Sequence, residues 1–306
     1  MANIAKIFVI IVTYKGHQWY ERCFTSLRES ELPVHPIVID NASNDGTIEY
    51  IREHFPEIHL IESKENLGFG RANNLGMRYA LDHGCDYVFL LNQDAWIEPN
   101  TLNELVRIHK KYPVYGVLSP MHLTADKKSI QSFLLSYLSN NTITDPILIQ
   151  DLYFNTLQEI YSSKYINAAG WLLPRNTLET IGGFCPLIYH YGEDDDYLNR
   201  VIFHRKLIGI CPSARMVHDT KERLKEGEVF FKESNWIRID KLLDINSELN
   251  FYSLKLFLVK KMIKAILTFD FITFRQIKHK YVYLSKNLKQ ILFCREQQMK
   301  VQSTWL

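Results

Sequence analysis

The chain has 306 residues, more than a single domain usually contains, so we expect a catalytic domain with an appended segment. Its net charge of +2 is unevenly divided, because residues 251–306 carry +9 and the first 250 residues carry −7. The basic segment is too apolar for a surface that follows nucleic-acid phosphates, so we expect no nucleic-acid partner. Five cysteines without paired or metal-like spacing indicate reduced thiols and a cytoplasmic setting.

The N-terminal residues lack the basic region, apolar core and cleavage site of a secretion signal. The apolar run at 7–12 is too short to span a membrane and predicts a first buried strand. Apolar runs then alternate with helical patterns, which predicts an α/β fold with a mostly parallel sheet flanked by helices. The expected strands cover residues 6–14, 35–43, 58–63, 87–94 and 115–120, and the expected helices lie near 17–30, 46–54, 69–83 and 100–111.

Polar side chains stand where three of these strands end. Ligands of open sheets lie beyond the carboxyl ends of the strands, so we expect these side chains to share one site. The carboxylate of Asp40 can accept a hydrogen bond from a base or ribose, although turn chemistry also explains the residues that follow it. The strand-end residues are Thr13, Tyr14, Asp40, Asn41, Asn92, Gln93 and Asp94.

The third expected helix begins in the glycine-rich stretch "ENLGFGRANNLG", which contains Arg71, Asn73 and Asn74. Glycines permit close approach to the backbone and a helix N-terminus favours anions, so this stretch suits a diphosphate or nucleotide. Its spacing differs from the dinucleotide-binding pattern G-x-G-x-x-G.

Asp94 is the leading metal-ligand candidate, because Mg²⁺ is commonly held by one or two carboxylates together with substrate phosphates. The alternative is a helix N-cap. Asn100 or Thr101 is better placed for that purpose.

Residues 124–166 interrupt the alternation, and they fit either a lid or binding loop or a packed surface insertion. A strand near 165–175, a helix with "TLETIGGF", a second helix within 189–206 and a late strand at 209–219 follow. The second helix begins with four acids, Glu193 to Asp196, which repel one another unless a cation, a substrate hydroxyl or Arg200 compensates. An over-capped helix is the alternative. His218 ends the late strand, where a structural role and a ligand role are both open.

Eight motifs, taken in chain order, resemble family 2 glycosyltransferases with the GT-A (Rossmann-like) fold: "IIVTYKG", "VIDNASNDGT", "NLGFGRANNLG", "LLNQDA", "AAGWLLPR", "IGGF", "GEDDDYLNR" and "MVHD". The resemblance covers residues 6 to about 220. Within that family, the pattern looks most like the rhamnosyltransferase-like members that build bacterial surface polysaccharides. It implies an inverting transfer from a nucleotide-diphosphate sugar, with L-rhamnose from dTDP-rhamnose as the first expectation.

The resemblance also implies roles for single residues. Asp94 matches the last acid of the D-x-D motif, which binds Mg²⁺ or Mn²⁺, and His218 matches a histidine that completes the metal site in some relatives. Asp194 matches the second acid of the "ED" motif, the general base that deprotonates the acceptor hydroxyl. Donor and acceptor contacts are expected from Thr13, Tyr14, Asp40, Asn41, Arg71, Asn73, Asn92, Gln93, Gly170, Trp171 and Glu193, with a packed core tryptophan as the alternative for Trp171.

Two positions depart from the family pattern. Asn92 stands where many members have the first Asp of D-x-D, so we expect lower metal affinity. "GGFCP" lacks the acid that often follows "GGF", which leaves an acceptor contact by Cys185 without support.

We expect a catalytic domain at 1–245, with a nucleotide-binding half at 1–120 and an acceptor-binding half at 121–245. Residues 246–306 are expected to form a basic amphipathic helical extension that docks on the inner face of the cell membrane, where a lipid-linked glycan acceptor would be presented. Packing on the catalytic domain and a homodimer contact are the alternatives. Other functions left open are a UDP-hexose or UDP-galactofuranose donor, a sugar nucleotidyltransferase and a non-catalytic carbohydrate-binding scaffold.

Overall fold

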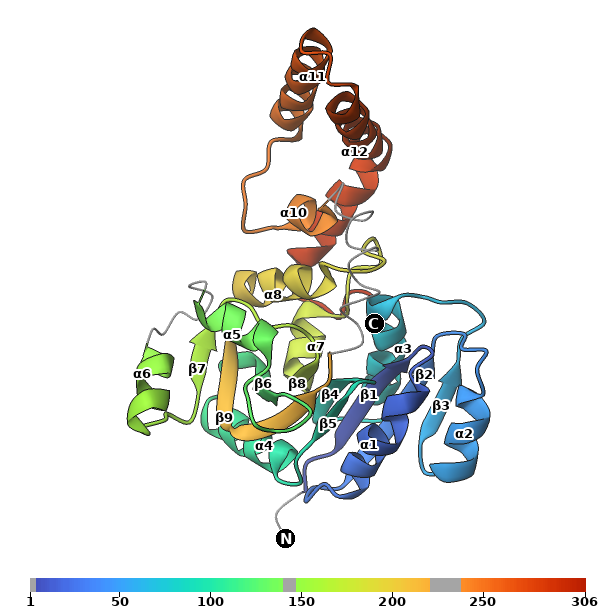
Figure 1. Ribbon diagram of the computed structural model, residues 1–306, viewed down its shortest axis with the longest axis vertical. Coiled ribbons are helices and arrows are strands. Elements are labelled where there is room, and N and C mark those ends of the chain that lie inside the picture. The colour runs from blue at the N-terminus through green and yellow to red at the C-terminus, as the bar shows by residue number, and fades with distance from the viewer. Residues whose placement is uncertain (1–3, 140–146, 221–237) are drawn as a thin grey trace.

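The computed structural model describes residues 4–139, 147–220 and 238–306 (Figure 1). The first half of the chain forms four neighbouring parallel strands in the order β3, β2, β1, β4. The strands and helices lie close to the positions predicted for them. They are β1 (Ile7–Thr13), α1 (His17–Arg28), β2 (Val34–Asp40), α2 (Thr47–His54), β3 (His59–Glu62), α3 (Phe69–Asp82), β4 (Tyr87–Asn92) and α4 (Thr101–Lys111).

The second half of the sheet contains antiparallel pairings, although most paired residues of the whole sheet lie in parallel ladders, as we expected. Strand β8 runs antiparallel to both of its neighbours, β4 and β6, while β6 and β9 are parallel. Strands β5 and β7 each pair antiparallel with β9. The strands of this half are β5 (Ala95–Ile97), β6 (Tyr115–Leu123), β7 (Tyr161–Ser163), β8 (Gly170–Pro174) and β9 (Leu207–His218).

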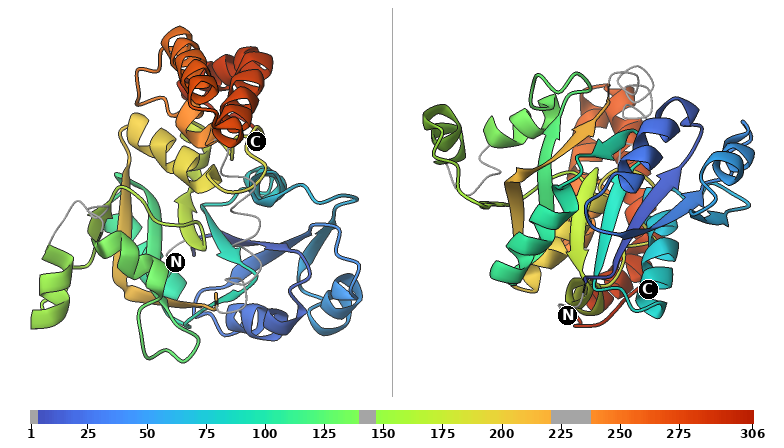
Figure 2. Two further views of the ribbon diagram at one scale, coloured as in Figure 1. Left: turned by 45° about the horizontal axis from the view of Figure 1, so that its top comes forward. Right: turned by 90° about the horizontal axis from the view of Figure 1, so that it is seen from below.

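Apolar side chains cover both faces of the sheet, as the apolar run of β1 illustrates. Phe8 and Ile10 point into one apolar cluster, whereas Ile7, Val9 and Ile11 point into the other. A strand buried on both faces reads as a continuous apolar run, because successive side chains point to opposite sides. The helices of the first half cover the two faces (Figure 2).

The insertion at 124–166 contains α5 (Ser132–Ser139), α6 (Ile147–Phe154) and β7. Leu134, Leu148 and Tyr161 from this segment belong to the main core, so its described part is a packed insertion. Residues 140–146 lie outside the described residues. After β8 come α7 (Arg175–Ile181) and α8 (Glu193–Phe203), which carries the four acids at its N-terminus.

The extension consists of α10 (Ile239–Leu243), α11 (Phe251–Leu267) and α12 (Phe271–Gln298). A separate apolar cluster includes Leu243, Leu258, Ile277 and Leu284 together with Cys185 of the preceding part of the chain. Packing of these helices on one another and on the preceding part, one of the alternatives that we considered for this segment, is therefore observed. No helix among the residues described has both the length and the apolar character needed to cross a membrane.

The last residues of the chain form hydrogen bonds with the end of α7 and with one of the glycines that follow it, before the four acids of α8. The amide of Gly183 donates to the carbonyl of Thr304 at 2.8 Å, and the amide of Gln302 donates to the carbonyl of Thr180 at 3.1 Å. Gly182 has φ +80°, and a Cβ there would lie 2.1 Å from the Thr304 oxygen, so this approach requires glycine. The extension is thus attached at both of its ends.

Candidate active site

The parallel strands bring Thr13 and Asp40 side by side at the carboxyl edge of the sheet, where they are paired in register. The Thr13 hydroxyl donates to Asp40 Oδ1 at 3.0 Å, and the Ser43 amide donates to Asp40 Oδ2 at 2.8 Å. Both side chains are completely buried. Asp40 is therefore held by its own turn, and each of its oxygens retains a second lone pair for a further donor.

Asn41 connects this edge to the glycine-rich stretch. Its Oδ1 accepts from the Leu67 amide at 2.9 Å, and its Nδ2 donates to the Gly68 carbonyl at 3.3 Å. Gly68 has φ +77°, and a Cβ there would lie 2.2 Å from the carbonyl oxygen of Tyr189. The loop before α3 is thereby fixed between the end of β2 and the chain that leads to α8.

The side chain of Gln93, just after β4, forms two hydrogen bonds with the backbone of Tyr14, just after the neighbouring strand β1. Its Oε1 accepts from the Tyr14 amide at 2.8 Å, and its Nε2 donates to the Tyr14 carbonyl at 3.1 Å. This pair of hydrogen bonds fixes the loop after β1 and leaves the Tyr14 ring exposed. Of these two residues, only Tyr14 has its side chain available to a ligand.

Asp94 and His218 meet because β5 pairs with the end of β9, which places Ala95 opposite His218. His218 Nε2 lies 3.6 Å from Asp94 Oδ1 and 3.5 Å from Asn92 Nδ2. Both Asp94 and His218 are buried, and the ring of His122 lies behind His218 with the ring centres 6.0 Å apart. Burial is the main cause that lowers the pKa of His122 to about 3, and the electrostatic effect of His218 is the smaller cause. This second ring is therefore neutral.

This arrangement fits a hard divalent cation only in part. One carboxylate and one imidazole are suitable ligands, and such ions commonly take their remaining ligands from phosphates and water. Within residues 4–139, 147–220 and 238–306, no three or more His, Cys, Asp or Glu side chains are grouped to hold a metal ion. A cation would therefore need a bound diphosphate to complete its coordination.

The four acids of α8 have separate environments. Asp196 is buried with Arg200, and Arg200 Nε lies 3.1 Å from Asp196 Oδ2. The same guanidinium donates to the carbonyls of Ile181 and Gly183, both at 2.8 Å. Gln298 from the end of α12 donates to Asp196 Oδ1 at 2.6 Å. Asp196 is thus a structural residue that joins α8 to the extension.

Asp195 faces the base of the extension, where Arg238 Nη2 lies 3.4 Å and Lys241 Nζ 3.9 Å from its carboxylate. Burial is the largest cause that raises its pKa to about 6, followed by the negative charges of Asp194 and Asp240. Arg238 also contacts Asp240 at 2.7 Å. The two cations limit the repulsion that the acid cluster creates.

Asp194 is half-buried, and its carboxylate is oriented by two donors. The Tyr165 hydroxyl donates to Oδ2 at 2.7 Å and the Asp195 amide donates to Oδ1 at 2.9 Å. Burial raises its pKa, and the Tyr165 hydrogen bond opposes that shift. A carboxylate with a fixed direction and a raised pKa has the properties of a general base.

Glu193 precedes this carboxylate and is buried. Among the described residues, its Oε2 has no hydrogen-bonding partner. Burial, followed by the charge of Asp194, raises the pKa of Glu193 to about 8, so a proton remains on this side chain at neutral pH. A protonated carboxyl group can donate a hydrogen bond to a substrate oxygen.

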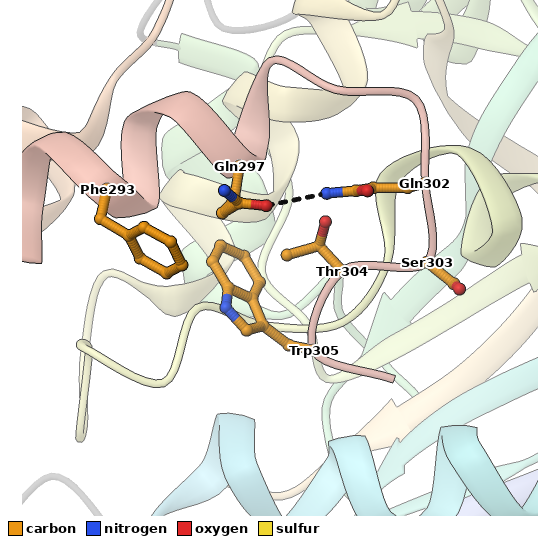
Figure 3. Close-up of a pocket in the computed structure, with 6 residues that line it drawn as sticks. All are labelled: Phe293, Gln297, Gln302, Ser303, Thr304 and Trp305. Atoms are coloured by element: carbon orange, nitrogen blue, oxygen red, sulfur yellow. Dashed lines mark hydrogen bonds between the residues drawn. The ribbon is translucent and has the colours of Figure 1, made fainter.

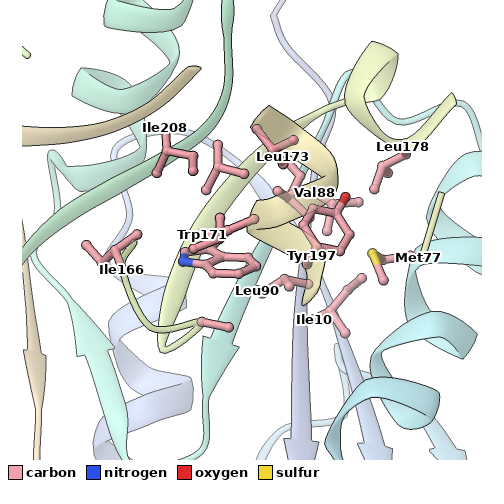
Figure 4. Close-up of a cluster of buried hydrophobic side chains, with 14 of the residues drawn as sticks. Ile10, Met77, Val88, Leu90, Ile166, Trp171, Leu173, Leu178, Tyr197 and Ile208 are labelled. Carbon is pink, nitrogen blue, oxygen red and sulfur yellow. The ribbon is translucent and has the colours of Figure 1, made fainter. Parts of the chain in front are cut away.

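Four of the expected donor-site residues lie in structural positions. Both Nε and Nη2 of Arg71 donate to the Pro186 carbonyl, at 3.0 and 2.7 Å, and Asn73 donates to the Phe69 carbonyl of its own helix. A Cβ at Gly170 would lie 2.2 Å from the Met216 sulfur. Trp171 is completely buried in the main core, where its ring contacts those of Phe184 and Tyr197, which is the core position we considered as its alternative. Figure 4 shows it beside Tyr197.

The structure adds residues to this region that we did not identify from the sequence. Tyr165 orients Asp194, and Arg238 contacts Asp195 from beyond residues 221–237, which lie outside the described residues. Asn74, which we named in the glycine-rich stretch without assigning these contacts, exchanges two hydrogen bonds with the backbone of Phe184, at 2.7 and 2.9 Å. These contacts join residues far apart in the chain, so no local spacing indicates them.

An open pocket lies where α12 meets the last residues of the chain (Figure 3). Gln302 Nε2 donates to Gln297 Oε1 at 3.0 Å across it. None of the candidate site residues lines it, so we assign it no part in the reaction. Its lining residues are Phe293, Gln297, Gln302, Ser303, Thr304 and Trp305.

Two curated relatives share most of the catalytic part of the chain. The N-acetylglucosaminyl-diphospho-decaprenol L-rhamnosyltransferase of Mycobacterium tuberculosis is 26% identical over 232 residues, which cover 69% of this chain and 75% of that protein. The dTDP-rhamnosyl transferase RfbF of Shigella flexneri is 24% identical over 221 residues, which cover 70% and 69%.

Solved structures share the fold at lower identity. The mannosyltransferase PcManGT of Pyrobaculum calidifontis, in complex with GDP-Man and Mn²⁺, has a TM-score of 0.56 and 19% identity, covering 97% of this chain and 74% of that one. TarS of Staphylococcus aureus has a TM-score of 0.54 and 14% identity, and the alignment covers 80% of this chain but only 40% of TarS.

Residues 8–157 match the family model "Glycosyl transferase family 2". This match includes Asp40, Asp94 and the first four strands, and the two relatives above extend the similarity over about 70% of the chain. The protein therefore contains a glycosyltransferase family 2 domain, has the GT-A fold and is similar to the rhamnosyltransferase members of that family.

Proposed function

We propose that the protein transfers a sugar, L-rhamnose from dTDP-rhamnose in the first instance, to a hydroxyl of a growing surface polysaccharide or lipid-linked glycan with inversion at the anomeric carbon. The observation that carries this proposal is the division between two groups of side chains. Asp194 is oriented by Tyr165, while Asp94 and His218 form a separate pair at the sheet edge. A base for the acceptor and a site for the leaving diphosphate are thus separate.

Asp194 acts on the acceptor. Its carboxylate removes the proton of the acceptor hydroxyl as the oxygen forms a bond to the anomeric carbon. The bond from that carbon to the diphosphate oxygen breaks, and the nucleoside diphosphate leaves with the electron pair. Attack on the side opposite the leaving group inverts the configuration. The hydrogen bond from Tyr165 keeps one carboxylate oxygen in a fixed direction for this step.

Asp94 and His218 would hold Mg²⁺ or Mn²⁺ at the diphosphate, with Asn92 beside them. When bound, the cation neutralises the negative charge that develops on the leaving group. This assignment is supported by the chemistry of the two side chains and by the presence of Mn²⁺ together with GDP-Man in the PcManGT complex. The amide at Asn92 provides a weaker ligand than a carboxylate, so we expect modest metal affinity.

The nucleotide would lie against the edge formed by Thr13, Tyr14 and Asp40. The exposed ring of Tyr14 offers a stacking surface for the base, and Asp40 offers an acceptor for a base N–H. Asn41 and Gln93 hold the two loops that surround this edge. Glu193, protonated at neutral pH, would donate to a sugar or acceptor oxygen.

The rhamnose donor is supported by the two rhamnosyltransferase relatives, and a UDP-hexose or UDP-galactofuranose is the alternative donor class. A nucleotidyltransferase is less consistent with the chain, because only Gly16 follows β1 where a glycine-rich phosphate loop would be needed. A peripheral position at the cytoplasmic face of the membrane and a homodimer remain predictions.

The proposal is tested by release of nucleoside diphosphate from dTDP-rhamnose, UDP-glucose, UDP-galactose and UDP-galactofuranose, each with Mg²⁺, with Mn²⁺ and with EDTA. We expect metal-dependent turnover of dTDP-rhamnose above the three UDP sugars. Preference for a UDP sugar would correct the donor and retain the reaction class. Absence of both turnover and nucleotide binding for all four donors would contradict the proposal.

A further inference from the structure

The turn between α11 and α12 exposes a group of large apolar side chains, which we call the hairpin tip (residues 263–272). The most exposed are Phe269, Ile272 and Leu267, at 78%, 75% and 74%. Figure 1 shows that α11 and α12 project away from the catalytic part, with this turn at their far end. The remaining apolar members are Ile263, Ile266 and Phe271.

These exposed side chains do not lie on the faces along which α11 and α12 pack together. The buried positions of the helix pair, Leu258, Ala265, Ile277 and Leu284, lie among the residues that face inward. The sequence predicted an amphipathic helix lying along a surface. Instead, the inward apolar faces of α11 and α12 are buried by packing, and the exposed apolar side chains lie at the turn.

The backbone conformation at the turn also places an aromatic residue at an unusual position. Phe269 has φ +51°, in the left-handed region where a bulky residue is disfavoured and glycine or asparagine is usual. Its ring nonetheless faces outward. Asp270, the one acid between residues 251 and 272, caps α12 by accepting from the Thr273 amide at 3.0 Å. A turn that only had to connect two helices would not need aromatic residues on both sides of its cap.

Exposed basic side chains lie on both helices next to the tip. Lys260, Lys261 and Lys264 on α11 are exposed, as are Arg275, Lys278 and Lys280 on α12. We call these six residues the basic collar. An apolar end with cations next to it on both helices matches a bilayer surface, because apolar groups enter the acyl boundary while lysines contact anionic headgroups.

We infer that the hairpin tip inserts into the surface of an anionic lipid bilayer and that the basic collar binds its headgroups. The insertion would be end-on, through the turn. Figure 2 shows that the extension stands on the side of α8, and Arg238 at its base contacts Asp195 beside the proposed acceptor base. The inserted tip would therefore present the acid-bearing side of the catalytic domain to the lipid surface.

This inference does not rest on the proposed reaction, because binding is measured without a donor. The full chain is mixed with sedimentable vesicles of phosphatidylcholine alone or of phosphatidylcholine with phosphatidylglycerol. We expect binding to the anionic vesicles that weakens with added salt. The double variant Phe269→Ser/Phe271→Ser should reduce the bound fraction at least about tenfold at equal lipid.

Tyr252→Ser/Phe293→Ser is the matched control, because it removes two exposed aromatic rings, at 78% and 57%, from the same two helices outside the tip. Its binding should equal that of the unmodified chain. Lys260→Gln/Lys261→Gln/Lys264→Gln should reduce binding, whereas Lys286→Gln/Lys289→Gln, nearer the other end of α12, should reduce it less.

The thermal unfolding midpoint of each variant shows whether the fold is intact, and molar mass by light scattering shows whether the chain is a monomer. Absence of binding by the unmodified chain, or equal binding by the tip variant, would overturn the inference. A dimer that the tip variant converts to a monomer, without vesicle binding by either, would identify the tip as a contact between two copies and would also overturn it.

Discussion

The Tyr165 hydroxyl donates a hydrogen bond to Asp194 Oδ2 at 2.7 Å, which joins the insertion before β8 to the first turn of α8. Burial raises the pKa of Asp194, and this hydrogen bond stabilises the ionised carboxylate against that effect. Tyr165 is therefore a positioning residue for the proposed base, because it acts on the carboxylate and not on the substrate.

Tyr165→Phe should move the acid limb of the kcat/KM profile to higher pH. Loss of the Tyr165 hydroxyl removes a hydrogen bond that lowers the pKa of Asp194. A smaller fraction of the base is then ionised at any pH below the limb. We expect the loss of transfer to be larger on the acid side of the profile than on the alkaline side, because fewer Asp194 carboxylates are ionised there. The measurement is transfer rate against pH.

Tyr161→Phe is the control for that change, because it removes a buried hydroxyl that donates to Asp151 at 2.6 Å, away from the acids of α8. Its pH profile should match that of the unmodified enzyme. A uniform loss across the whole pH range in Tyr165→Phe would instead indicate a structural role for this tyrosine.

Asp94→Asn and His218→Ala should each weaken the metal dependence of nucleotide binding. The two side chains approach each other at 3.6 Å, and removing either leaves a single protein ligand of suitable chemistry. We expect at least about a tenfold higher Mn²⁺ concentration for half-maximal binding of nucleoside diphosphate, measured by calorimetry. Asp151→Asn, another buried carboxylate, should leave the Mn²⁺ titration unchanged. An unchanged titration in both site variants would place the metal elsewhere.

Glu193→Gln should make the fold less sensitive to pH. The pKa of Glu193 is raised from 4.5 to about 8, so the folded state binds more protons than the unfolded state in this window. The free energy of unfolding therefore falls as pH rises from about 4.5 to 8. The free energy of unfolding of the variant minus that of the unmodified protein should therefore be about 4 kcal/mol larger at pH 8 than at pH 4.5.

Urea unfolding at both pH values measures this difference. Glu296→Gln, an exposed residue whose carboxylate lies 2.9 Å from Lys300, should show no comparable pH-dependent gain. Equal pH slopes in Glu193→Gln and the unmodified protein would contradict the raised pKa.

Arg200→Met should destabilise the fold by about 3–5 kcal/mol, because it leaves the buried Asp196 carboxylate without its cation. It also removes the donors to the Ile181 and Gly183 carbonyls. Lys300→Met, which removes only the exposed pair with Glu296, should cost less than about 1 kcal/mol. Chemical denaturation of the two variants tests this, and similar costs would mean that the Asp196 pair contributes little.

The sequence predicted the first half of the fold well, because strands buried on both faces and their crossover helices leave strong periodic patterns. No direction for β8 could be predicted from the sequence, since an apolar run such as Gly170–Pro174 is the same in a parallel or an antiparallel strand. The strand also pairs with β4, more than 70 residues earlier in the chain, and no local signal records that partner.

Within the site, the resemblance to family 2 glycosyltransferases assigned roles to Asp194 and His218, while residue type and strand position were sufficient to nominate Asp94. They were not sufficient to separate contacts with substrate from contacts within the protein. Gln93 and Arg71 have the chemistry of ligand-binding groups, yet their donors face the backbone of Tyr14 and Pro186. Those pairings depend on the folded positions of distant segments.

The assignment of Asp194 as the base is tested by comparing Asp194→Asn with Asp195→Asn in parallel assays of donor binding and sugar transfer. The two residues are adjacent and both have a raised pKa, but only Asp194 is oriented by Tyr165. We expect Asp194→Asn to bind the donor normally and to lose transfer by about 10²–10⁴-fold, while Asp195→Asn loses much less. Transfer by Asp194→Asn within tenfold of the unmodified enzyme would contradict this assignment.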